Sequence, residues 1–205
     1  MECSLKVPRL LANSMPTTRS ELFSRLDELG IRTSTIEHEA VFTVAESERL
    51  ERGLSGGHTK NLFLKDAKGR LFLIIAESHT AVDLKTLHKT LGCARLSFGK
   101  ADLLMDILGV PAGSVTALSL INDREQRVSV IIDARLMGHD SINCHPLENT
   151  ATTTIGRDDL VKFIRACGHD PKILALSDPI GSETSRRAAS TGQGESRPRP
   201  PGGHD

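Results

Sequence analysis

Residues 141–155 read Ser141-Ile142-Asn143-Cys144-His145-Pro146-Leu147-Glu148-Asn149-Thr150-Ala151-Thr152-Thr153-Thr154-Ile155. Four threonines and two asparagines supply hydrogen-bond donors and acceptors without fixed charge, and His145 is the only group here that titrates near neutral pH. Pro146 favours an extended backbone at the residue before it. We predict two strands, Asn143–Leu147 and Asn149–Ile155. Two interpretations stay open: a site for a polar substrate, or a threonine-rich edge strand after a turn.

Outward from this stretch, helical and strand patterns are interleaved, which predicts a mixed α+β domain. Thr17 or Thr18 caps the first expected helix, with Glu21 placed for a capping box and Gly30 at its end. The further expected elements, in chain order, are a strand Ile31–Glu37, a short helix Val44–Arg52 capped by Thr43, a hairpin of Thr59–Leu64 and Leu71–Ala76, helices Asp83–Leu91 and Lys100–Leu108, strands Ala117–Ile121 and Arg127–Asp133, a helix Asp158–Cys167 and a strand Lys172–Leu176.

The ends of the chain differ in composition from its centre. Residues 1–17 carry no periodic pattern, and from Ser177 onward Ser, Gly, Arg and Pro dominate. We therefore expect a flexible arm over 1–17, one folded domain over 18–176 and a disordered tail over 177–205.

Composition narrows the classes of function. The 205 residues contain 26 Lys+Arg and 26 Asp+Glu, so we do not expect the chain to bind nucleic acid through its net charge. Because Trp and Tyr are absent, few aromatic side chains are available to stack on bases. The four cysteines form no CxxC pair, which argues against a zinc ribbon or redox dithiol and favours a reducing, cytoplasmic setting. No run approaches the roughly 20 apolar residues of a membrane span.

Three features are candidates for chemistry. Lys60 follows the glycine-rich loop 53–58 at the start of an apolar strand, where an ammonium can meet a phosphate or a developing oxyanion; the alternative is an edge lysine that prevents aggregation. The turn Gly109-Val110-Pro111-Ala112-Gly113 can present backbone groups to a ligand, although most such turns only connect two elements. It is not a P-loop, because the Gly-Lys-Ser/Thr ending is missing. We predict that the Lys60 strand, this turn and residues 143–154 form one polar cleft.

Metal and nucleophile chemistry find less support. The spacing of His139, Cys144 and His145 matches no common ligand pattern, so neither a metal nor a cofactor is expected. Cys144 and His145 are adjacent, and neighbours on a strand point to opposite faces, so adjacency does not make them a nucleophile–base pair.

At these same positions the sequence resembles the YbaK-type aminoacyl-tRNA deacylases, which include the editing insertion of bacterial prolyl-tRNA synthetases. The motifs that carry the resemblance, which spans roughly Ser20–Pro171, are Thr59-Lys60-Asn61-Leu62-Phe63-Leu64, Leu108-Gly109-Val110-Pro111-Ala112-Gly113-Ser114-Val115, Leu120-Ile121-Asn122-Asp123 and Asn143-Cys144-His145-Pro146-Leu147-Glu148-Asn149-Thr150-Ala151-Thr152-Thr153. The His-Pro-Leu-x-Asn-Thr-Ala-Thr run points to the free-standing branch called ProXp-ala or PrdX. Asn143-Cys144 lacks the aromatic residue usual before this run, which leaves the shape of the amino-acid pocket open.

The resemblance implies a mixed, barrel-like sheet flanked by helices and hydrolysis of the ester in mischarged alanyl-tRNA(Pro). It implies Lys60 and His145 as catalytic residues and the 109–113 turn, Asn149 and Thr150 as substrate-binding residues, and we add Thr43 to the latter. The implied partners are the acceptor end of tRNA(Pro) and, beyond it, prolyl-tRNA synthetase. Two alternatives stay open: a deacylase of the same fold for cysteine or serine, and a non-catalytic module that binds tRNA or a synthetase.

Overall fold

The computed structural model describes residues 15–40 and 53–176. Three predictions fall wholly or partly outside these residues: the arm over residues 1–14, Thr43 with the helix Val44–Arg52, and the tail from Ser177 onward.

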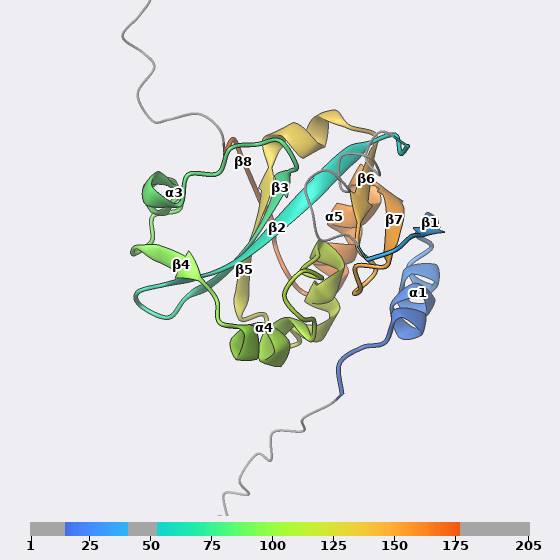
Figure 1. Ribbon diagram of the computed structural model, residues 1–205, viewed down its shortest axis with the longest axis horizontal. Helices are drawn as coiled ribbons and strands as arrows, with labels where there is room; N and C mark the ends of the chain where they lie inside the picture. The colour runs from blue at the N-terminus through green and yellow to red at the C-terminus, as the bar shows by residue number, and fades with distance from the viewer. Residues whose placement is uncertain (1–14, 41–52, 177–205) are drawn as a thin grey trace, which may run out of the picture.

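Helices and strands alternate along the described chain, as the patterns predict (Figure 1). The helices are α1 (Arg19–Glu28), α3 (Leu84–Thr90), α4 (Ala101–Leu108) and α5 (Arg157–Ala166), with two 3-10 helices, η1 (Ala117–Asn122) and η2 (Ala134–Gly138). The strands are β1 (Thr33–Glu37), β2 (Gly57–Asp66), β3 (Leu71–Glu77), β4 (Leu96–Phe98), β5 (Val128–Asp133), β6 (Ser141–Cys144), β7 (Ala151–Gly156) and β8 (Lys172–Leu174).

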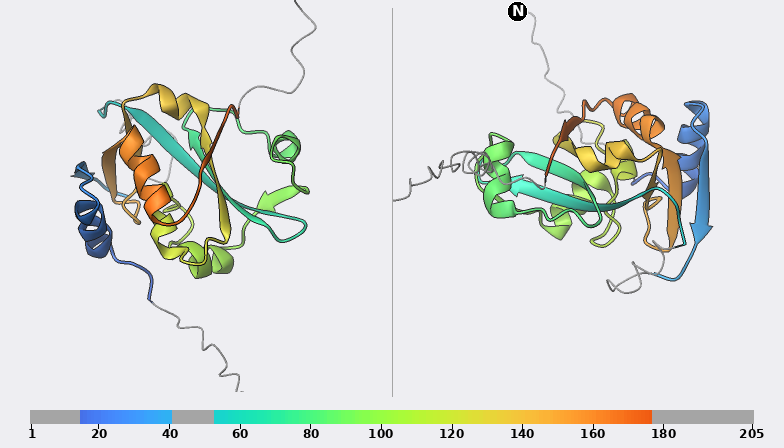
Figure 2. Two further views of the ribbon diagram at one scale, coloured as in Figure 1. Left: turned by 180° about the vertical axis from the view of Figure 1, so that it is seen from behind. Right: turned by 90° about the horizontal axis from the view of Figure 1, so that it is seen from above.

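These strands form one mixed sheet in the order β1-β7-β6-β2-β3-β5-β8, with β4 paired to β2 beside this path. The pairs β2–β6, β3–β5 and β5–β8 are parallel and the others are antiparallel. Seen from above, α3 and the tip of the β2–β3 hairpin lie at one end of the molecule, and α1 with β1 lies at the other (Figure 2). This confirms the expected α+β architecture of a mixed sheet flanked by helices.

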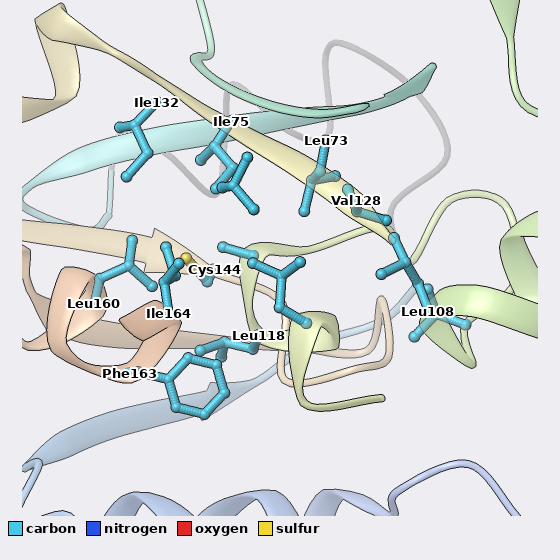
Figure 3. Close-up of a cluster of buried hydrophobic side chains, with 14 of the residues drawn as sticks. Leu73, Ile75, Leu108, Leu118, Val128, Ile132, Cys144, Leu160, Phe163 and Ile164 are labelled. Carbon is cyan, nitrogen blue, oxygen red and sulfur yellow. The ribbon is translucent and has the colours of Figure 1, made fainter. Parts of the chain in front are cut away.

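Side chains from opposite faces of β2, β3 and β5 enter two apolar cores. The larger core packs Leu73 and Ile75 of β3 against α4, η1 and α5, where Leu160, Phe163 and Ile164 lie opposite the strand residues (Figure 3). In the smaller core, Leu64, Phe72, Ile74 and Ile131 pack against Leu87 of α3. Alternation along a strand therefore assigns each residue of β2 and β3 to one core or the other.

The first helix begins as its sequence predicts. The Thr18 hydroxyl accepts the Glu21 backbone N–H, and the Glu21 carboxylate accepts the Thr18 N–H at 2.7 Å, which completes a capping box. Leu22 and Leu26 are buried, and Gly30 follows in the left-handed conformation.

The strand prediction for Ala117–Ile121 is wrong, because this run forms η1. Thr116 caps it by accepting the Leu118 N–H, and the Ser119 hydroxyl donates to the Thr116 carbonyl. A five-residue run with four apolar residues fits a buried helix turn as well as a strand, so periodicity does not separate the two. Strand β4 and helix η2 are too short to give a pattern and were not predicted.

Candidate active site

The site begins with the face of β2 on which Lys60 lies. Lys60 pairs with Ala76, and Leu62 and Leu64 on the same face of β2 pack into the smaller core. His58 shares this parity, so His58 and Lys60 lie on one face of the strand. The half-buried Lys60 ammonium donates to the Ser78 carbonyl at 2.9 Å, and in the part of the chain that is described it has no carboxylate partner.

Strand β6 adds an amide to this face. Its residues Ile142 and Cys144 point into the larger core, so Asn143 points the other way, and His145, which directly follows β6, lies close enough to His38 for the two rings to interact electrostatically. The Asn143 amide donates to the Ser55 carbonyl at 3.0 Å and lies 3.5 Å from His58 Nε2, and its Oδ1 accepts the Thr154 hydroxyl at 2.6 Å. Asn143 is only 3% exposed, so these bonds fix the centre of the face.

Strand β1 delivers a further imidazole. The His38 backbone N–H donates to the Thr150 carbonyl, and its Nδ1 lies 2.8 Å from the Glu39 carbonyl. A carbonyl only accepts, so Nδ1 carries the proton, and in the neutral ring Nε2 accepts the Thr152 hydroxyl at 2.9 Å.

The neutral His145 ring has one acceptor nitrogen that lacks a partner among the described residues. Its Nδ1 donates to the Ala151 carbonyl at 3.2 Å, so in the neutral ring Nε2 is an acceptor, and no hydrogen bond to it arises from the residues described. Burial lowers the pKa of His145 below its ordinary value, the hydrogen bond to the Ala151 carbonyl partly offsets this, and electrostatic repulsion from His38 lowers the pKa further. The imidazole is therefore neutral at pH 7.

We call this surface the polar face. It lies on the side of β1, β7, β6 and β2 away from the larger core, and its members are His38, His58, Lys60, Asn143, His145, Thr152 and Thr154. None of these side chains is a carboxylate, so the fixed charge of the face is positive. Such a face suits a ligand that brings its own negative charge or a developing oxyanion.

The 109–113 turn is anchored by the larger core and by Asn122. Leu108 and Val110 are buried in the larger core, and Gly109 takes a left-handed φ of 63°. The Asn122 amide donates to the Leu108 carbonyl, and Asn122 Oδ1 accepts the Thr17 N–H. Within the described ranges no hydrogen bond joins this turn to Lys60 or His145, so its place in the cleft stays a prediction.

Asn149 and Thr150 occupy the turn between β6 and β7. Asn149 is half-buried, Thr150 is exposed, and the turn is held by Glu148, which accepts from Arg19 at 2.7 Å. Leu147 has a left-handed φ of 72°, which is uncommon for a branched side chain. The turn thus abuts the end of the polar face, through the Thr150 carbonyl that holds His38.

Sequence reasoning missed His38 and His58. His58 could have been found, because it stands two positions before Lys60 and therefore shares its face of the strand. His38 lies 114 residues from Thr152, and only the pairing of β1 with β7 brings them together. On the opposite side of β2, Asn61 Oδ1 is buried and lacks a partner among the described atoms, although its amide lies 3.4 Å from the Thr59 hydroxyl.

The sequence matches the family model of the aminoacyl-tRNA editing domain over residues 38–163. The chain belongs to this family. The prolyl-tRNA editing protein ProX of Acetoanaerobium sticklandii is 36% identical over 159 residues, which cover 77% of this chain and 97% of that protein. A prolyl-tRNA synthetase associated domain-containing protein 1 of Danio rerio is 42% identical over 160 residues, covering 77% and 87%.

Solved structures agree with the editing-domain fold. The structure of a candidate trans-editing enzyme for prolyl-tRNA synthetase superposes with a TM-score of 0.61 at 15% identity, covering 80% of this chain and 99% of that one. Within the described residues no helix is long and apolar enough to cross a membrane, and no group of three or more His, Cys, Asp or Glu is arranged to hold a metal ion.

Proposed function

We propose that this editing domain is a trans-editing deacylase that hydrolyses the ester of alanyl-tRNA(Pro). The observation that carries the proposal is the polar face itself, where the Lys60 ammonium has no carboxylate partner in the described chain and a neutral His145 lies on the same side of the sheet. Family membership and the names of the relatives support the class of reaction.

The chemistry needs little acid–base power because an aminoacyl ester is already activated. Water adds to the ester carbonyl, the oxyanion forms, and the ribose oxygen leaves with a proton to give free alanine and a tRNA 3′ end. We assign Lys60 to the terminal phosphate or to the ester oxygen, where negative charge lies or develops. A ribose hydroxyl of the substrate assists the attacking water, in keeping with a polar face whose described members include no carboxylate.

His145 is assigned to the α-amine. Its unprotonated Nε2 is an acceptor, and an α-ammonium group is a donor, so the two are complementary. Asn149 and Thr150 shape the pocket around the methyl group, and the 109–113 turn orients the acceptor end. We assign the selection of alanine over proline to steric exclusion of the larger proline ring. Attractive contacts alone would select weakly, because one methylene of a substrate in an apolar pocket changes kcat/KM by only about 10–200-fold.

The tRNA(Pro) acceptor end is thus the proposed partner, and prolyl-tRNA synthetase, which supplies the mischarged substrate, is the second. We assign the activity to residues 18–176.

The test is deacylation of alanyl-, prolyl-, cysteinyl- and seryl-tRNA by the purified protein beside Lys60→Ala and Lys60→Arg. We expect selective loss of alanine and a fall of at least about 100-fold in kcat/KM for Lys60→Ala. Arg165→Ala removes the same charge from the exposed end of α5 and should change little. Circular dichroism checks that each variant folds.

The alternatives give different outcomes in the same assay. Selective loss of cysteine or serine keeps the mechanism and changes the substrate. If no ester is hydrolysed by the folded protein, the non-catalytic binding module replaces the enzyme.

A further inference from the structure

One end of the molecule is basic although the whole chain has equal numbers of cations and anions. We call this end the basic lobe. It consists of the tip of the β2–β3 hairpin, α3 and β4, which lie together in both views (Figures 1 and 2). Its six exposed cations are Lys65, Lys68, Arg70, Lys85, Lys89 and Arg95.

Acidic groups hardly offset these cations. Residues 84–98 contain no Asp or Glu, and the hairpin residues 64–76 contain only Asp66. Asp66 is buried and already accepts the N–H groups of Lys68 and Arg70 and Nε of Arg70. At the edge of the lobe Asp83 serves as the N-cap of α3. Of the six cations, only Arg70 has an ion pair with another described residue.

The lobe is a rigid surface. The Ala67 N–H donates to the Arg95 carbonyl at 3.0 Å, and the Ala94 N–H donates to Asp66 at 3.3 Å. Strand β4 pairs with β2 next to these bonds. Lys65, Lys68 and Arg95 therefore lie on or beside backbone segments that are hydrogen-bonded to one another.

The lobe also lies along the same strand as the candidate site. Lys65 is five positions after Lys60 on β2, a span of about 17 Å, and by alternation the two side chains leave opposite faces of the strand. Phe98, opposite Leu64, is 64% exposed and offers an aromatic surface between the cations. Between Arg70 and Lys172 lies a hollow of about 470 Å³, lined also by Thr90 and Gln126.

We propose that the basic lobe binds the phosphate backbone of the RNA helix whose acceptor end enters the polar face. This deepens, and rests on, the proposed function. RNA is favoured over an acidic protein because the backbone of an RNA helix offers phosphates along its whole length, so one helix can reach cations about 17 Å from its acceptor end. The exposed Phe98 can stack on an unpaired base, which an acidic protein would not use in that way.

The test compares two triple variants with the same change in charge. Lys65→Gln/Lys68→Gln/Arg95→Gln alters the lobe, and Arg32→Gln/Arg124→Gln/Arg165→Gln alters exposed cations outside it. Uncharged tRNA(Pro) is titrated against each full-length protein at several salt concentrations. For the lobe variant we expect Kd to rise at least about 10-fold and the slope of log K against log salt to fall by about 2, since each phosphate contact contributes about 0.7–0.9.

Hydrolysis separates the lobe from the site. On alanyl-tRNA(Pro) the lobe variant should raise KM and leave kcat unchanged, whereas alanyl-adenosine, which has no helix, should be hydrolysed at the wild-type rate. Equal losses in both triple variants, or an unchanged salt slope, would overturn the proposal. So would loss of binding to purified prolyl-tRNA synthetase with tRNA affinity intact, because that result assigns the lobe to a protein.

The binding assay also keeps the two proposals distinguishable. If no ester is hydrolysed, the enzyme proposal fails, and the salt dependence of tRNA binding still decides the lobe. If esters are hydrolysed and the lobe variant binds tRNA normally, the lobe proposal alone fails.

Discussion

At the scale of single residues, the polar face combines a cation with a neutral imidazole. Lys60 has only a backbone carbonyl as its described partner, and His145 has one free acceptor nitrogen. A protonated His145 would add a second positive charge to the polar face, beside that of Lys60, and would remove that acceptor. The protonation state of His145 therefore decides whether the face can receive an α-ammonium group.

We predict that His145 titrates below the ordinary histidine value of about 6.5, because burial disfavours its charged form. The unfolded chain takes up this proton first as pH falls through about 6.5, so the free energy of unfolding should decrease with falling pH until the folded pKa is reached. Proton–carbon NMR of ¹³C-labelled histidine, assigned with His145→Gln, measures the midpoint. A midpoint at or above 6.5 would show that Nε2 meets an anion.

The reactivity of Cys144, the residue before His145, tests whether its thiol can act as a nucleophile. Burial raises the pKa of this thiol to about 12, so at pH 8 only about one molecule in ten thousand carries the thiolate. We expect iodoacetamide to leave Cys144 unmodified in the native protein and to alkylate it in urea, as read from peptide masses. Rapid alkylation in the native state would restore Cys144 as a candidate nucleophile.

The sequence allowed part of this site to be predicted. Lys60 and His145 stand in recognisable motifs, and alternation along β2 puts Lys60 on the face of His58, which pairs with Asn143 of β6. His38 could not be found, because it reaches Thr152 through the pairing of strands far apart in the chain. Periodicity within a segment carries no information about which strands pair.

At the scale of elements, Asn122 is the residue that joins three segments. Its side chain binds the Leu108 carbonyl at the end of α4 and the Thr17 N–H before α1, and its backbone ends η1. The Asn122 side chain thus satisfies the Leu108 carbonyl and the Thr17 N–H, which the side chains of Ala117–Ile121 do not contact by hydrogen bonds among the described residues. The same run explains the wrong strand prediction, since its helical form depends on the partners of Thr116 and Asn122 rather than on its own pattern.

We predict that Asn122→Ala lowers the free energy of unfolding by about 1–3 kcal/mol, because it leaves a buried carbonyl and an amide without partners. For a domain of this size each kcal/mol corresponds to about 2–4 °C in Tm. Thermal unfolding followed by circular dichroism measures the change. Glu125→Ala, an exposed change in the following turn, is the control and should stay within about 0.5 kcal/mol. Equal effects of the two variants would contradict the anchoring role.

At the scale of the whole molecule, one sheet connects the polar face to the basic lobe. Strand β2 pairs with β6 at one end and with β4 at the other, so the candidate site and the lobe share a backbone. The central strands carry an apolar core on each side, so β2 is packed on both faces between the two surfaces. Their relative position then depends on both cores remaining folded together.

Adjacent residues of β3 test whether the two cores form one cooperative unit. Leu73 faces the larger core and Ile74 the smaller, and both are fully buried. We predict that Leu73→Ala and Ile74→Ala each cost about 2–5 kcal/mol, because each leaves a cavity in a packed interior. Urea unfolding of both variants should show one transition with an unchanged slope, since the strands that line one core also line the other.

Ile74→Val, the conservative control, should cost only about 0.5–1.5 kcal/mol. A second transition in Ile74→Ala alone would mean that α3 and the basic lobe unfold separately from the site, and the two surfaces would then not be held at a fixed distance.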